Sequence, residues 1–217
     1  KVKVLNNGTI NGIDFTGKFS NTNESESVEL RNLLQLNDQF VLGFLGRVNE
    51  DKGIRCLIEA YRTLRKTHTN LMLCIVGPNE LAIPIASLFH PSELTNVLII
   101  DRVDTPECYL KMFDLHVFLS VREGFGLALA EASAVGTPSV AYNIFGIKDA
   151  IQDNFTGTLV PFGDLLSVAA ACEAYITSPD LLQSHSANGM EYVREKFIKE
   201  ELWQAQKDFY LELLDHD

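Results

Sequence analysis

Two glutamates, Glu123 and Glu131, stand eight positions apart in the stretch REGFGLALAEASA, and only glycine, alanine, leucine and one phenylalanine lie between them. Gly124 and Gly126 permit a tight turn whose backbone a ligand can approach closely. A helix that begins near Gly126 presents unpaired N–H groups and the positive end of its dipole, and proteins bind anions at such places. The stretch therefore predicts an anion site flanked by two carboxylates.

Glu131 is expected about one and a half turns into this helix, roughly 7 Å along the axis at 1.5 Å per residue. That distance matches the separation between a diphosphate at the helix tip and its ribose, whose two hydroxyls a carboxylate can bind. Glu123 precedes the turn, on the side where a sugar would lie. The plainer interpretation makes Glu123 an acid at a helix start and Glu131 a solvated residue. Because ALAEASA has the composition of a buried helix, in which a charge needs a partner, we favour the functional interpretation.

The segment GRVNEDKG offers a second candidate, since Arg47 and Lys52 lie between an apolar run and a helix that begins near Gly53. A rigid guanidinium and a flexible ammonium at such a point suit a phosphate group. Taken alone, the two residues are better explained as solvated surface cations. The spacing is not that of a P-loop, which requires G-x-x-x-x-G-K-[ST].

Other segments that follow apolar runs are weaker candidates. Gly77 would allow a ligand close to the backbone, although a plain turn explains it better. Backbone groups of Arg102 and Val103 could read the edge of a base. Residues 142–147 form either a plain loop or one that closes over a ligand. The five histidines show no metal-ligand spacing, and His116 falls in a strand pattern typical of a core residue.

Short apolar runs that could position these residues alternate with helical patterns from Val28 onward. We predict strands at residues 41–46, 71–77, 96–101, 115–120 and 138–142, within about six β-α units between Gln39 and roughly Thr177. Their lack of polar alternation indicates strands buried on both faces, as in a parallel sheet covered by helices, which binds ligands at the carboxyl ends of its strands. Helices are expected at 28–36, 54–66, 180–196 and 201–214, and a lead-in strand at 2–5.

Composition narrows the class of protein. The chain has 217 residues, of which 46% are hydrophobic, so one sizeable core is expected. A net charge of −11 argues against nucleic acid or an anionic membrane as the main partner. The apolar runs are too short to span a bilayer. Four widely spaced cysteines indicate buried free thiols in a reducing compartment rather than a disulfide or zinc site.

Four segments together resemble glycosyltransferase family 4, whose members have the GT-B fold. The spacing from Glu123 to Glu131 matches the family's E-x(7)-E signature. The family's G-R-x(4)-K-G element is matched by Gly46, Arg47, Lys52 and Gly53. VLNNGTINGIDFTGKF is similar to the crossover between the family's two domains, and DNFTGTLVPFGD also fits. The resemblance covers most of residues 4–165 in the family's order.

The resemblance implies a full-length protein of two Rossmann-like domains with the active site between them. This chain would be the C-terminal, donor-binding domain: a Rossmann-like parallel α/β sheet with helices on both faces, plus C-terminal helices. Residues 1–27 would form the linker and crossover strand, 28–196 the nucleotide-sugar-binding domain, and 197–217 the helix that crosses back. The N-terminal, acceptor-binding domain would be absent.

The implied reaction transfers a sugar, with retained configuration, from a UDP- or GDP-linked donor to a saccharide or lipid-linked acceptor. Arg47 and Lys52 would bind the diphosphate together with the amides of residues 125–127, Glu131 would hold the ribose and Glu123 would contact the sugar. The implied donor-binding residues are Gly46, Arg47, Lys52, Gly77, Arg102, Val103, Glu123, Gly124, Phe125, Gly126, Leu127 and Glu131, of which Arg47, Lys52 and Glu123 are also the catalytic candidates. No metal or other cofactor is expected.

The same resemblance implies a cytoplasmic protein of polysaccharide biosynthesis, whose full-length form could associate peripherally with a membrane. The isolated chain is expected to transfer little sugar without its N-terminal domain. One segment departs from the family, which often has Gly-Gly and then Pro-Glu after the fifth strand. Phe145-Gly146-Ile147-Lys148-Asp149 stands there instead, so the donor sugar stays open.

Two alternatives remain. A GT-B sugar-nucleotide epimerase would need further acids and histidines around the sugar, which the sequence does not offer. A non-catalytic nucleotide-binding or interaction module would have the same fold. It would leave Arg47, Lys52, Glu123 and Glu131 without a common task.

Overall fold

The sheet at the centre of the molecule is parallel throughout. The computed structural model describes residues 11–19, 24–36 and 38–214, and the strand predicted at 2–5 lies outside them. The strands are β1 (Phe40–Leu45), β2 (Leu71–Val76), β3 (Val97–Ile100), β4 (Leu115–Phe118), β5 (Ser139–Tyr142) and β6 (Gly157–Val160). Their spatial order is β3-β2-β1-β4-β5-β6. The chain adds β2 and β3 on one side of β1 and then returns to add β4, β5 and β6 on the other side, so the strand order switches between β1 and β4.

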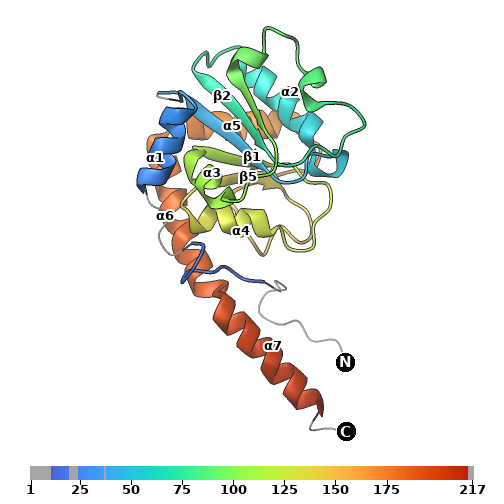
Figure 1. Cartoon of the computed structure of the whole chain (residues 1–217), viewed down its shortest axis with the longest axis vertical. Helices are drawn as coiled ribbons and strands as arrows, with labels where there is room; N and C mark the ends of the chain where they lie inside the picture. Colours follow the sequence, from blue (N-terminus) through green and yellow to red (C-terminus); the bar gives the residue numbers. More distant parts are fainter. Residues whose placement is uncertain (1–10, 20–23, 37, 215–217) are drawn as a thin grey trace.

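Helices cover both faces of this sheet (Figure 1). They are α1 (Glu24–Leu33), α2 (Ile54–Arg65), α3 (Pro106–Met112), α4 (Leu127–Ala134), α5 (Leu165–Thr177), α6 (Pro179–Lys196) and α7 (Lys199–Leu214). On one face α2 contacts α5, while α1, α3 and α4 follow one another on the other face and α6 packs against α4. The predicted Rossmann-like α/β fold is confirmed.

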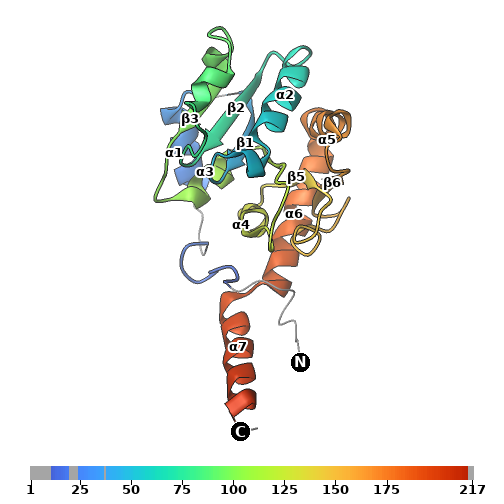
Figure 2. The same cartoon turned by 90° about the vertical axis from the view of Figure 1, so that its right-hand side faces the viewer.

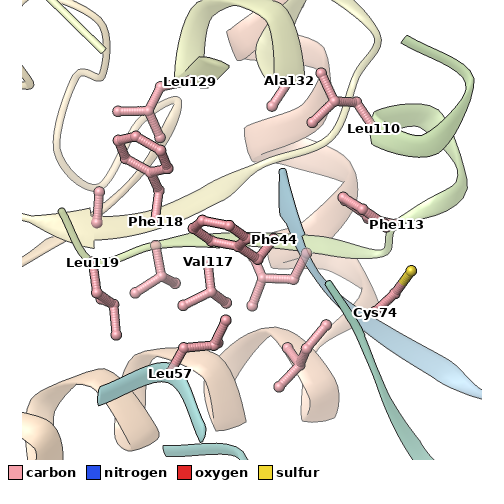
Figure 3. Packing of buried hydrophobic residues seen from close by; sticks show 14 of the residues in the cluster. Phe44, Leu57, Cys74, Leu110, Phe113, Val117, Phe118, Leu119, Leu129 and Ala132 are labelled. Atoms are coloured by element: carbon pink, nitrogen blue, oxygen red, sulfur yellow. The ribbon is translucent and has the colours of Figure 1, made fainter. Parts of the chain in front are cut away.

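Burial explains why the strands read as unbroken apolar runs. Every residue of β2, β4 and β5 is buried, and the packing around Phe44, Phe118 and Leu57 is dense (Figure 3). His116 lies in β4 as a core residue, as predicted, and its Nδ1 lies 3.2 Å from the Ser139 hydroxyl on β5. Burial lowers the pKa of His116 to about 3, so the imidazole is neutral at physiological pH.

Element boundaries differ from the prediction at both ends of the domain. The first helix begins at Glu24 rather than Val28, and so extends into the predicted linker. The sequence pattern missed this first turn because the charged and serine-rich ESES has no apolar stripe. The last helix begins at Lys199 rather than residue 201. The strand β6 shows a weaker apolar run than the others because its two central residues are only half-buried. All four cysteines are free, but only Cys74 and Cys172 are buried.

Where the chain enters and leaves the domain, its two ends run side by side. Ile13 and Ile198 form a parallel bridge: the Ile13 N–H donates to the Phe197 carbonyl at 2.7 Å, and the Lys199 N–H donates to the Ile13 carbonyl at 3.1 Å. Lys199 also pairs with Asp14 at 3.0 Å. Beyond this junction α7 extends away from the sheet and its helices (Figure 2).

Two glycines in loops that follow strands should respond differently to replacement by alanine. Gly77 has φ +139° and a Cβ there would lie 2.0 Å from the Gly46 carbonyl oxygen, whereas a Cβ at Gly124 would meet nothing within 4 Å. We expect Gly77→Ala to lower the free energy of unfolding by about 2 kcal/mol or more and Gly124→Ala to change it by less than about 0.5 kcal/mol. Urea denaturation measures both, and equal stability of the two variants would contradict the backbone packing described here.

Candidate functional site

The loops after β1 and β4 pack directly on each other at the carboxyl edge of the sheet. The first loop contains a short 3-10 helix, Glu50–Lys52, capped by Asn49, whose side chain accepts from the Lys52 N–H at 3.2 Å. The Asp51 carbonyl accepts from the Val121 N–H at 2.9 Å and from the Ser120 hydroxyl at 3.1 Å. Segments about 70 positions apart in the sequence are thereby held in register.

An ion pair between Lys52 and Glu123 crosses this contact. Only 16% of the Lys52 side chain and 13% of the Glu123 side chain are exposed, and the ammonium lies 5.3 Å from the centre of the Phe118 ring. The structure thus brings together two of the three predicted catalytic residues. From the sequence, Lys52 is expected at the diphosphate and Glu123 at the sugar, and their direct pairing is not predicted.

Arg47, the third predicted catalytic residue, pairs with a different acid. Its Nη1 lies 3.0 Å from Glu80 Oε2, and the Asn49 amide donates to the same oxygen at 2.9 Å. The Arg47 side chain is 62% exposed, so the pair is weak and the guanidinium is free to move toward a ligand. Glu80 was not a predicted site residue. The signal that could have found it is an acid in the loop after β2, since Arg47 and Lys52 follow the neighbouring strand β1.

The stretch from Gly124 to Leu127 forms a turn and a helix start, as predicted. Gly126 has φ +76° and precedes the first residue of α4, and no side chain caps this helix end. The Leu129 N–H donates to the Gly126 carbonyl at 2.9 Å, and the amides of Leu127 and Ala128, the first two of α4, are therefore the ones available to an anion.

The loop after β5 closes against the back of this turn. A Cβ at Gly146 would lie 2.4 Å from the Glu123 carbonyl oxygen and 2.7 Å from that of Gly124. Gly146 thus fixes the turn from outside, whereas the space over Gly124 is open. In the sequence, Gly146 stands out only as part of the segment that departs from the family pattern.

Glu131 is a half-buried carboxylate on α4, and among the residues that the structure describes no hydrogen bond or ion pair reaches it. Burial raises the pKa of Glu131, Lys18 opposes the rise and Glu107 adds to it. Lys18 pairs with Glu107 at 3.3 Å, so a linker cation and an α3 acid lie near this carboxylate. Neither residue was predicted, because both are remote from Glu131 in the sequence.

The other predicted site residues occupy the same edge without such chemistry. The close approach that Gly77 permits is made by the Gly46 carbonyl, which accounts for the glycine without a ligand. The Arg102 N–H donates to the Asp101 carboxylate at 2.8 Å, and Val103 is half-buried after β3. A contact of these two residues with a base stays a prediction.

Comparison with known proteins identifies the arrangement. The family described as glycosyl transferases group 1 matches residues 27–192, which include the loop of Lys52, the turn of Glu123 and helix α4. The chain belongs to this family. The predicted resemblance to GT-B glycosyltransferases is thus confirmed at the level of family and fold.

The sequence is also similar to individual glycosyltransferases. The chain is 31% identical to the capsular polysaccharide biosynthesis glycosyltransferase CapM of Staphylococcus aureus, over 97% of the chain and 55% of CapM. It is 27% identical to the N-acetyl-alpha-D-glucosaminyl L-malate synthase of Bacillus anthracis, over 82% of the chain and 46% of that enzyme. The chain therefore spans about half the length of the curated relatives it matches.

Among solved structures, Anabaena HepE in complex with UDP and glucose superimposes with a TM-score of 0.81 at 21% identity, covering 92% of this chain and 55% of HepE. S. aureus TarM in complex with UDP and other ligands gives a TM-score of 0.74 at 26% identity, covering 78% of this chain and 35% of TarM. The first of these likenesses, at its low identity, shows the fold alone.

The described residues contain neither a metal-ligand cluster nor a membrane-spanning helix. Within these residues no three His, Cys, Asp or Glu side chains are grouped so that they could hold a metal ion. None of the helices in the described ranges is long and apolar enough to cross a membrane.

The raised pKa of Glu131 predicts a gain in stability when its charge is removed. A carboxyl whose pKa rises on folding from the usual 4.5 stabilises the fold below that pH and loses this contribution as the pH rises through the folded pKa. We therefore expect Glu131→Gln to raise the thermal midpoint at pH 7 and to lose this advantage as the pH falls below 4.5.

Glu59→Gln is the matched control, because Glu59 is an exposed helical acid on α2 rather than on α4. Scanning calorimetry of the three proteins at several pH values measures the effect. A Glu131→Gln variant that is less stable than the wild type at pH 7 would show that the carboxylate has a stabilising partner.

Proposed function

We propose that this chain is the donor-binding half of a glycosyltransferase that takes its sugar from a nucleoside-diphosphate donor. The observation that carries the proposal is that the Lys52 ammonium lies beside the turn that leads into the uncapped start of α4. Lys52 contacts Glu123, which lies three residues before Gly126. Gly126 in turn directly precedes the first amides of α4. A diphosphate over Gly124 would meet both, in space that is open.

Lys52 supplies the charge that the reaction needs. When the bond between the sugar and the diphosphate breaks, negative charge builds up on the leaving phosphate, and the ammonium and the helix amides stabilise it in place. Lys52 is paired with Glu123, so the incoming diphosphate shares or takes over this cation. Arg47 adds a second, mobile cation after releasing the exposed Glu80.

The two glutamates hold the ends of the donor. Glu131 accepts hydrogen bonds from the ribose hydroxyls, which provides the partners that it lacks among the described residues. Glu123 is fixed by Lys52 and contacts the transferred sugar on the other side of the turn. The backbone at Arg102 and Val103 contacts the base.

The remaining features of the reaction are extensions of the same proposal. Retention of configuration, independence from metals and membership of family 4 follow from the motif resemblance. The acceptor is a saccharide or a lipid-linked saccharide, in line with the capsular polysaccharide role stated for the CapM relative. Because the chain spans about half of such relatives, we propose that acceptor binding and efficient transfer need the N-terminal domain.

Calorimetric titration with UDP and with GDP tests the donor site. We expect one of the two to bind with a dissociation constant below about 1 mM and Glu131→Ala to weaken this binding tenfold or more. A hydrogen bond to a charged group contributes about 1.5–3 kcal/mol, and tenfold corresponds to about 1.4 kcal/mol.

Glu173→Ala, at a half-exposed acid remote from the site, should bind the nucleotide as the wild type does. Absence of binding of either nucleotide at millimolar concentration contradicts the donor site. Unchanged affinity of Glu131→Ala contradicts the ribose role alone.

A further inference from the structure

The turn of the proposed donor site rests on the junction between α6 and α7. Phe125, between the two glycines of the turn, packs edge-on against Phe197, with ring centres 5.0 Å apart and an interplanar angle of 76°. Phe197 is completely buried and ends α6, where its N–H donates to the Val193 carbonyl at 2.9 Å. The ring of Phe197 thus supports the residue whose backbone leads into the free amides of α4.

The same junction also holds the loop behind the turn. Tyr192 also packs against Phe197, with ring centres 5.5 Å apart, and its hydroxyl donates to the Asp149 carbonyl at 2.9 Å. Asp149 lies three residues after Gly146, where a Cβ would collide with the Glu123 and Gly124 carbonyls. Both segments that shape the proposed phosphate site are therefore attached to one aromatic cluster, formed by Phe125, Tyr192 and Phe197.

The backbone of Phe197 is fastened to the entering chain. Its carbonyl accepts from the Ile13 N–H at 2.7 Å, and the Lys199 N–H donates to the Ile13 carbonyl at 3.1 Å. The ion pair of Lys199 with Asp14 closes the junction at the surface. Any shift of the entering chain against α7 therefore acts on Phe197, and a packed ring pair transmits such a shift rather than absorbing it.

We propose that Phe197 is a positioning residue that couples the donor turn to the chain junction at Ile13 and Lys199. Through Phe125 it holds the amides of the turn where a diphosphate binds, and nucleotide binding in turn tightens the junction, because coupling between two sites is reciprocal. This inference rests on the proposed function. It adds that the contacts of the entering and leaving chain segments set the affinity of the site.

Phe197→Leu tests the coupling, because it keeps an apolar side chain but removes the ring contact. We expect it to weaken UDP or GDP binding about fivefold to tenfold, within the usual range of coupling between sites. Phe125→Leu should have a similar effect, and the double variant should bind no more than about twofold more weakly than either single one, since both remove the same contact.

Phe89→Leu is the matched control. Phe89 is also a buried phenylalanine, but it packs beside Arg62, away from the site. It should lose stability comparably and keep the wild-type affinity. Equal weakening of binding by Phe89→Leu, or unchanged binding by Phe197→Leu, would overturn the positioning role.

Hydrogen exchange separates coupling from general stabilisation. In the wild type, saturating nucleotide should slow exchange of the Ile13 and Lys199 amides at least fivefold, and in Phe197→Leu at saturation this slowing should be absent. Slowing that is the same in both proteins, or absent in a wild type that binds nucleotide, contradicts the inference. A wild type that binds no nucleotide fails the proposed function instead.

Discussion

The ion pair between Lys52 and Glu123 is the interaction on which the candidate site depends. Both side chains are largely buried, and burying charges in this way costs desolvation that only a close partner offsets. The pair therefore holds the loop after β1 against the loop after β4, and the hydrogen bonds of Asp51 to Val121 and Ser120 fix the same register. The pair gives the ammonium a defined position beside the turn before α4, which other contacts also hold.

A second constraint is a cost rather than a stabilising contact. Glu131 carries a raised pKa in a helix of small apolar residues, and a fold selected only for stability would place a neutral side chain there. Such unmatched carboxylates are typical of binding sites, where the ligand supplies the missing hydrogen bonds. The donor proposal gives this residue its partner, and it gives Lys52 a second anion to bind.

Most of the fold and part of the candidate site could be predicted from the sequence, because the signals for them are local. Unbroken apolar runs indicated a parallel sheet, and the spacing of Glu123 and Glu131 around a glycine turn indicated a helix start with free amides. The contacts that could not be predicted join residues remote in the chain. Examples are the pairing of Lys52 with Glu123, the approach of Lys18 to α3 and the ring contact of Phe125 with Phe197. Tertiary packing alone sets these contacts.

A crystal structure of the chain with bound UDP or GDP tests the central claim most directly, namely that one diphosphate site lies between Lys52 and the start of α4. We predict phosphate oxygens within hydrogen-bonding distance of Lys52 Nζ and of the first amides of α4, and ribose hydroxyls within that distance of the Glu131 carboxylate. A nucleotide bound with its diphosphate away from this turn, or with its ribose away from Glu131, would contradict the account.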